Sequence, residues 1–243
     1  MFVPIADANP LENIVRPYVT WGLLAVNVLV FAVLQHGALG EVSEAGVLGY
    51  GTIPAVVTGE AVLPPGYERL PPLLTLVTYM FLHGGWLHLI GNMAFLFVFA
   101  DNVEDALGHW RFLAFYLLCG IIAGAAHILA DPASEVPLVG ASGAVAGVIA
   151  AYLMLHPNIR LWALLLMKIP LRVPAYWVIG AWFTLQVWQV LAAHDQETAW
   201  WAHLGGFLSG AVLVAVMRQP GVVLFDRDPS GVPSRPAPRR SER

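Results

Sequence analysis

The sequence is poor in charge and in cysteine. Only 12% of its 243 residues are Asp, Glu, Lys or Arg, whereas soluble domains carry about 25%. The single cysteine, Cys119, excludes an intrachain disulfide and makes redox chemistry unexpected. Segments of about ten alternating polar and apolar residues are also absent, which excludes a membrane-spanning barrel. These absences exclude an ordinary soluble domain and a disulfide-stapled one.

Hydrophobic residues are what the chain has in excess. They make up 58% of it and gather into runs long enough to cross a bilayer as helices. Backbone groups in lipid must bond within their own segment, so each run is expected to be helical. The predicted fold is an all-α, multi-pass membrane protein, a bundle of six transmembrane helices. The expected spans are 19–34, 86–100, 110–130, 137–155, 175–193 and 199–217.

Basic residues predict the orientation of this bundle. Of the twelve Lys and Arg residues, eleven fall on one side of the expected spans and only Arg69 on the other. This bias places both termini in the cytoplasm. Three parts follow: a short cytoplasmic N-terminus (1–18), a membrane domain (19–217) with a long first loop at about 35–85, and a tail (218–243). The tail is rich in Pro and Arg and is expected to be disordered.

Two shorter apolar stretches are expected to lie along the membrane surface. Residues 70–82 of the first loop should rest in the outer interface. Residues 161–167, which Lys168 follows, resemble a short cytoplasmic interfacial stretch. Whether the first loop or the short loop 194–198 gates access to the interior is left open by the sequence.

Four polar side chains stand out within the apolar runs: His88, Asn92, Ser142 and His203. In the topology above, the second, fourth and sixth spans all run inward from the outer face. Both histidines and the serine lie a few residues after the start of these spans. A helix rises about 1.5 Å per residue, which places all three within roughly 10 Å of the outer surface. The pattern predicts one shared site that is wetted from outside.

Small residues predict which helices meet at that site. Gly143 and Gly147 are four residues apart, as are Gly206 and Gly210, and such faces let two membrane helices approach closely. Close packing of the fourth and sixth spans would bring the serine hydroxyl towards His203. These four glycines are therefore predicted to be helix-packing residues.

The chemistry of these groups favours acyl transfer. A histidine can activate a serine hydroxyl as a nucleophile, and donors from the Ser142 N–H, the Asn92 amide and the His88 ring would stabilise an oxyanion. No Asp or Glu lies within an expected span. The base would thus lack a carboxylate partner, giving a dyad of Ser142 and His203 rather than a triad.

The chain resembles the rhomboid intramembrane serine proteases. The resemblance rests on Gly-Ala-Ser-Gly at 140–143, on Ala-His-Leu-Gly-Gly at 202–206 with Gly210, and on His88 and Asn92. It implies that Ser142 is the nucleophile and His203 the general base, with His88, Asn92 and the Ser142 N–H stabilising the oxyanion.

The resemblance also implies a substrate class and a reaction. Single-span membrane proteins would be cut near the outer ends of their helices through an acyl-enzyme, within the lipid bilayer. No metal, cofactor or nucleic acid would be involved. The expected location is a bacterial inner membrane, and the oligomeric state is left open. The chain departs from the family pattern at Leu74 and Thr75, where many members have Trp-Arg. It also has Ala146 where some have a tyrosine that stacks on the histidine.

Two other functions compete with proteolysis. The chain could be a catalytically inactive, rhomboid-like protein that binds membrane clients, although such relatives typically lose Ser142 or His203. A transporter using His88 and His203 as ion ligands is disfavoured because no carboxylate lies in the expected spans. Among the other histidines, His83 is equally consistent with a structural contact in the loop and with a role in the site. His127 is interpreted as structural.

Overall fold

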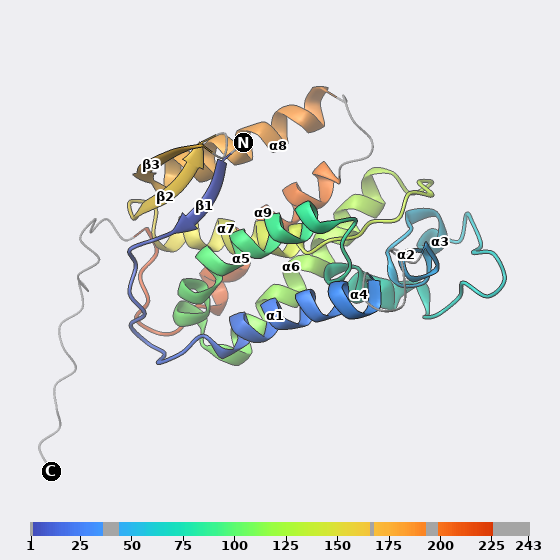
Figure 1. Ribbon diagram of the computed structural model, residues 1–243, viewed down its shortest axis with the longest axis horizontal. Helices are drawn as coiled ribbons and strands as arrows, with labels where there is room; N and C mark the ends of the chain where they lie inside the picture. Colours follow the sequence, from blue (N-terminus) through green and yellow to red (C-terminus); the bar gives the residue numbers. More distant parts are fainter. Residues whose placement is uncertain (1, 36–43, 166–167, 193–198, 226–243) are drawn as a thin grey trace, which may run out of the picture.

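The computed structural model describes residues 2–35, 44–165, 168–192 and 199–225. Its chain is mostly helical, and a helix covers most of each expected span (Figure 1). These helices are α1 (Tyr18–Leu29), continued by the π-helical turn η1 (Val30–Gln35), α5 (Trp86–Leu107), α6 (His109–Ala130), α7 (Ser142–Leu155), α8 (Ala175–Ala192) and α9 (Trp200–Met217).

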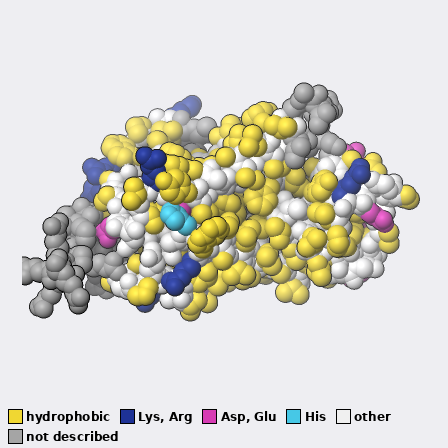
Figure 2. Space-filling view, turned by 90° about the horizontal axis from the view of Figure 1, so that it is seen from below, with side chains coloured by type: hydrophobic (Ala, Val, Ile, Leu, Met, Phe, Trp, Pro, Cys, Tyr) yellow, Lys and Arg dark blue, Asp and Glu magenta, His cyan; other side chains and the backbone are white. Residues whose placement is uncertain are grey.

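The surface has the character of a membrane protein. Within the described part of the chain, α5, α6 and α9 are long and apolar enough to cross a bilayer, while α7 is a shorter apolar helix. Figure 2 shows hydrophobic side chains over the middle of one face and charged side chains towards its two ends. A bilayer would match the apolar middle, because charged groups avoid hydrocarbon.

The helix α7 forms the centre of the bundle. Nearly every residue from Gly143 to Leu155 is buried, and α9 packs along it at two pairs of glycines. A Cβ atom added to Gly206 would overlap the backbone of Gly143, and one added to Gly210 would overlap Gly147. The two backbones therefore touch, an approach that only residues without side chains permit.

The helix α5 continues beyond the expected end of the second span. That span was predicted to stop at residue 100, but α5 runs to Leu107 and includes Asp101, Glu104 and Asp105. The fully buried Glu104 accepts hydrogen bonds from the N–H groups of Val19 and Thr20. The first N–H groups of a helix have no partner within it, so this carboxylate satisfies the start of α1.

The neighbouring Asp105 holds the N-terminal segment in the same way. One of its oxygens accepts from the N–H groups of Glu12, Asn13 and Ile14. The longer helix therefore carries carboxylates, although none lies within the expected span. Both groups are tolerated because backbone donors satisfy them.

A three-stranded antiparallel sheet corrects the all-α prediction. Its strands are β1 (Phe2–Ala6), β2 (Arg160–Leu165) and β3 (Ile169–Pro174), in the order β1-β2-β3. Leu161 and Ala163 are fully buried, while Trp162 between them is exposed. This alternation is typical of a strand with one covered face. Residues 161–165 of the stretch predicted to lie along the membrane thus belong to the central strand of a sheet.

The apolar end of the first loop packs into the bundle. It forms η2 (Pro72–Leu74), α4 (Thr75–Thr78) and η3 (Tyr79–Phe81). Tyr79 and Met80 are fully buried, and the Tyr79 hydroxyl donates to the Gly120 carbonyl of α6 at 2.7 Å. This stretch was expected to rest on the outer surface. It belongs to the core instead, although its first turn remains exposed.

The rest of the first loop lies at the end of the molecule opposite the sheet. It contains α2 (Glu44–Tyr50) and α3 (Pro54–Thr58), which Figure 1 shows far from β1, β2 and β3. Thr52 and Leu138 exchange backbone hydrogen bonds. The first loop is therefore joined to the segment that leads into α7.

The beginning of the expected disordered tail is ordered. The Gln219 N–H donates to the Ala106 carbonyl, and the Phe225 N–H donates to the Met154 carbonyl. The chain after α9 thus folds back against α5 and α7. The remainder of the predicted tail, 226–243, lies outside the described residues.

The glycine contact between α7 and α9 makes a first prediction. Gly206→Ala should lower the free energy of unfolding by about 1–3 kcal/mol, because the new methyl group overlaps the Gly143 backbone. The measurement is the thermal unfolding midpoint in detergent. Gly180→Ala in α8 is the matched control, since a Cβ there meets nothing within 4 Å. It should unfold at or above the wild-type temperature. Gly206→Ala unfolding at the wild-type temperature would contradict the prediction.

Candidate active site

Three of the singled-out side chains lie at the starts of three helices. His88 is in the first turn of α5, Ser142 is the first residue of α7, and His203 is in the first turn of α9. The fourth span was expected from residue 137, but the helix begins only at Ser142. Gly140 precedes it with a φ of 122°, a conformation that favours glycine, and its N–H donates to the Tyr79 carbonyl at 3.0 Å.

The serine and the histidine lie within hydrogen-bonding distance. Ser142 Oγ is 2.9 Å from His203 Nε2. The backbone contact between Gly206 and Gly143 lies one turn below His203 and directly after Ser142. The spacing of the pair is therefore set by main-chain packing, which is stiffer than a contact between long side chains.

A glutamine contacts the other nitrogen of the same ring. Gln186 of α8 places Oε1 2.8 Å from His203 Nδ1, and its Nε2 donates to the Trp182 carbonyl at 3.3 Å. Only 3% of Gln186 is exposed. Sequence reasoning missed this residue. The available signal was an amide within the fifth apolar run, a position where a polar side chain needs a partner.

Two potential oxyanion donors gather beside the loop that leads into α7. A Cβ atom on Gly140 would lie 2.7 Å from His88 Nε2 and 3.7 Å from Asn92 Nδ2. The Gly84 N–H points to His88 Nδ1 at 3.4 Å, so that nitrogen accepts and Nε2 carries the proton. The buried Asn92 Nδ2 has no hydrogen-bond partner among the described residues. Both groups can therefore donate towards a common point near Ser142.

The Ser142 and His203 pair borders a cavity of about 460 Å³. Its wall includes Ser142, His203 and His88, together with His127 of α6. The rest of the wall is Ser134, Val136, Pro137, Leu138, Val139 and Ala199. A wall that combines polar and apolar side chains is suited to a peptide segment.

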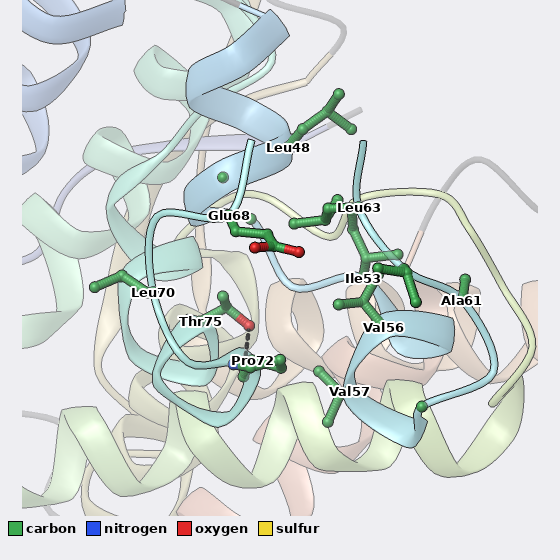
Figure 3. A pocket seen from close by; sticks show the side chains of 14 residues that line it. Leu48, Ile53, Val56, Val57, Ala61, Leu63, Glu68, Leu70, Pro72 and Thr75 are labelled. Carbon is green, nitrogen blue, oxygen red and sulfur yellow. Dashed lines mark hydrogen bonds between the residues drawn. The ribbon is translucent and has the colours of Figure 1, made fainter. Parts of the chain in front are cut away.

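A second cavity, of about 400 Å³, lies within the first loop. Figure 3 shows it lined by apolar side chains such as Leu48, Ile53 and Leu63, with Glu68 beside them. It shares no lining residue with the cavity at Ser142. The candidate catalytic groups therefore belong to one cavity only.

His83 lies next to the site but has a different environment. It is fully buried in the loop before α5, and its ring centroid is 5.3 Å from that of His88. Burial, followed by the proximity of His88, lowers the pKa of His83 to about 4. The ring is therefore neutral at physiological pH. Among the described residues, no group of three His, Cys, Asp or Glu side chains could hold a metal ion.

Comparison with known proteins identifies the family. Residues 71–220 match the family model described as "Rhomboid domain", and the chain belongs to the rhomboid family. It is an integral membrane protein, as its apolar helices indicate.

Curated relatives agree with this family. "RHOMBOID-like protein 5" of Arabidopsis thaliana is 33% identical over 142 residues, 58% of this chain and 43% of the relative. "Putative rhomboid protease YdcA" of Bacillus subtilis (strain 168) is 40% identical over 80 residues, 33% of this chain and 40% of the relative. "Rhomboid-like protein 11, chloroplastic" of Arabidopsis thaliana is 38% identical over 84 residues, 35% of this chain and 30% of the relative. The chain thus spans less than half the length of each of these relatives.

The buried neutral His83 predicts a pH-dependent stability. In the unfolded chain His83 has a pKa near 6.5 and binds a proton below that pH. In the folded protein it binds the proton only near pH 4. The contribution of neutral His83 to the free energy of unfolding is therefore fully present above pH 6.5 and is lost as the pH falls towards 4. His83→Gln should flatten this fall in the thermal unfolding midpoint, with the two curves parallel above pH 7. Equal slopes between pH 6.5 and 4 would refute the assignment.

Proposed function

We propose that this chain is an intramembrane serine endopeptidase that works through a dyad of Ser142 and His203. The observation that carries the proposal is the 2.9 Å distance between Ser142 Oγ and His203 Nε2, at the wall of a cavity. A hydroxyl bonded to an imidazole is the arrangement that nucleophilic catalysis requires. The family match and a relative named as a rhomboid protease add support.

Acylation begins when His203 Nε2 takes the Ser142 hydroxyl proton. Oγ then forms a bond to the carbonyl carbon of the scissile peptide, giving a tetrahedral oxyanion. His203 returns the proton to the amide nitrogen as the C–N bond breaks, and the amine-bearing fragment leaves. Water repeats the sequence at the acyl-enzyme, giving a carboxylic acid and free Ser142. The mechanism draws only on side chains, backbone groups and water.

The oxyanion would be held beside Gly140. The Ser142 N–H lies at the first turn of α7, where the helix supplies no acceptor and the dipole is positive. His88 Nε2 and Asn92 Nδ2 approach from α5. Donors already aimed at the developing charge lower the barrier, because they need no reorganisation during the reaction.

The substrates we propose are single-span membrane proteins. The site lies near the ends of three helices rather than at their middle, so a substrate helix would be cut close to the outer surface. Its backbone must unwind to present a carbonyl, which exposes unpaired N–H and C=O groups. Substrates with poor helix formers such as Gly or Pro near the cut should therefore be preferred.

Substitution of the dyad tests the activity. Ser142→Ala and His203→Ala should each abolish cleavage of a model single-span substrate in proteoliposomes, while the thermal unfolding midpoint stays near that of the wild type. Asn92→Ala should lower kcat by about 100-fold, the usual effect of losing one oxyanion donor. The measurement is cleavage followed by gel and by mass spectrometry of the products.

An inactive, client-binding role makes the opposite prediction. In that case a fluorophosphonate probe would leave Ser142 unlabelled in the wild type, and the protein would retain clients without cutting them. Wild-type labelling that disappears in Ser142→Ala would separate the two functions in favour of proteolysis. Cleavage that persists in Ser142→Ala would end the proposal.

The finer topology belongs to the same proposal. We infer six spans, with α1, α7 and α8 crossing beside α5, α6 and α9, and both termini in the cytoplasm of a bacterial inner membrane. The membrane domain would cover 19–217, between an N-terminal segment and a cytoplasmic tail. The support is the eleven-to-one distribution of basic residues.

Cysteine labelling tests this topology with little labelling expected from the native protein. The only native cysteine, Cys119, is buried. An impermeant maleimide added to intact spheroplasts should label Glu60→Cys, in the first loop, but should label Ser234→Cys, in the tail, only after permeabilisation. Equal labelling of both variants in intact cells, or the reverse pattern, would contradict the orientation.

A further inference from the structure

We propose that Gln186 is a positioning residue that holds His203 in the tautomer able to accept the Ser142 proton. This inference rests on the proposed function and extends it to a third side chain, on α8. It starts from a requirement of the chemistry: a neutral imidazole carries one N–H, and only the other nitrogen can act as a base. If the proton sat on Nε2, the nitrogen facing Ser142 Oγ could not accept a second one.

The direction of the Gln186 amide follows from its second partner. The Trp182 carbonyl can only accept a hydrogen bond, so the amide NH₂ must face it, at 3.3 Å. The amide oxygen must then face His203, and Oε1 is 2.8 Å from Nδ1. An amide oxygen cannot donate, so Nδ1 must carry the proton. Nε2 is left with its lone pair towards Ser142 Oγ, at 2.9 Å.

Three hydrogen bonds thus form one directed chain. Ser142 Oγ–H donates to His203 Nε2, Nδ1–H donates to Gln186 Oε1, and the Gln186 amide donates to the Trp182 carbonyl. A backbone carbonyl of α8 therefore determines which nitrogen of the ring is basic. Bonds linked in this way polarise one another, which strengthens the acceptor at Nε2.

An amide suits this position better than a carboxylate would. Gln186 is nearly fully buried on a helix whose neighbouring side chains are mostly apolar, where a permanent negative charge is costly. The amide oxygen still accepts the Nδ1–H when His203 holds two protons, so its dipole stabilises the transient imidazolium. The charge exists only during the reaction, and no fixed ion has to be buried.

Two aromatic rings flank the histidine. The Trp182 ring centroid is 6.0 Å from that of His203, and the Trp200 ring meets it edge-on at 5.9 Å. Trp182 and Gln186 are four residues apart on α8, so they share a face. Ala146, one turn after Ser142, brings no ring to the histidine. The orientation of His203 therefore comes from α8 and from the first turn of its own helix.

The test compares two glutamines of the same helix. Gln186→Leu removes the acceptor and replaces it with an apolar side chain of similar size. Gln189→Leu is the matched control, because Gln189 is only partly buried and lies three residues further along α8. Each variant is measured for kcat and KM with a model substrate, and for the rate at which a fluorophosphonate labels Ser142. The probe reaches the dyad without a substrate helix having to enter.

We expect Gln186→Leu to lower kcat and the labelling rate together by about 10- to 100-fold, as for loss of a hydrogen bond to a group that becomes charged. KM should stay unchanged, and Gln189→Leu should behave as the wild type. Gln186→Glu should recover most of the loss, because the apolar surroundings favour the neutral acid, whose O–H can donate to the Trp182 carbonyl while its other oxygen accepts from His203 Nδ1.

Three results would overturn the role of Gln186. The first is Gln186→Leu slowing cleavage while leaving labelling untouched, which would place the residue in substrate entry. The second is Gln186→Glu being as slow as Gln186→Leu, and the third is equal loss in Gln189→Leu. In each case wild-type labelling at Ser142 would leave the proposed protease intact. Absence of that wild-type labelling would remove the protease and this role together.

Discussion

The contact between the backbones of α7 and α9 is the constraint on which the rest of the structure depends. Within lipid, helices gain little from the hydrophobic effect when they associate, so their packing relies on close van der Waals contact. Gly206 and Gly210 supply it by lying directly on Gly143 and Gly147. The same contact fixes the separation of Ser142 and His203, which sit at its outer end. Stability and site geometry therefore share one interaction.

The two ends of the bundle differ in how their polar groups are bonded. At one end, Glu104 and Asp105 satisfy the backbone donors of the N-terminal segment, and β1 joins it to the strands that follow α7. At the other end lie the cavity, the first loop and the three helix starts. At the first end the carboxylates of Glu104 and Asp105 are satisfied by backbone donors. At the second end Asn92 Nδ2 is left available, as the proposed oxyanion site requires.

Hydropathy and small-residue spacing were enough to predict the helices, the facing glycines and the side chains that meet at Ser142. The sheet was missed because residues 161–167 form a short apolar run, and burial on one face appears only once β1 and β3 flank it. The extension of α5 was missed because Asp101, Glu104 and Asp105 indicate a loop until their backbone donors are known. Gln186 was missed because its partner is 17 positions away on another helix. The misses at α5 and Gln186 concern polar groups whose partners are distant in sequence.

The placement of Gln186 on α8 has a physical consequence for how the site is held together. Ser142 and His203 belong to the helix pair whose backbones touch, so their spacing resists small movements of the bundle. The acceptor for His203 Nδ1 comes from a third helix, α8, on which Trp177 and Trp188 are exposed. A displacement of α8 would therefore alter which ring nitrogen is basic before it altered the distance between Ser142 Oγ and His203 Nε2. The tautomer of His203 thus depends on the position of α8, whereas the distance between Ser142 and His203 does not.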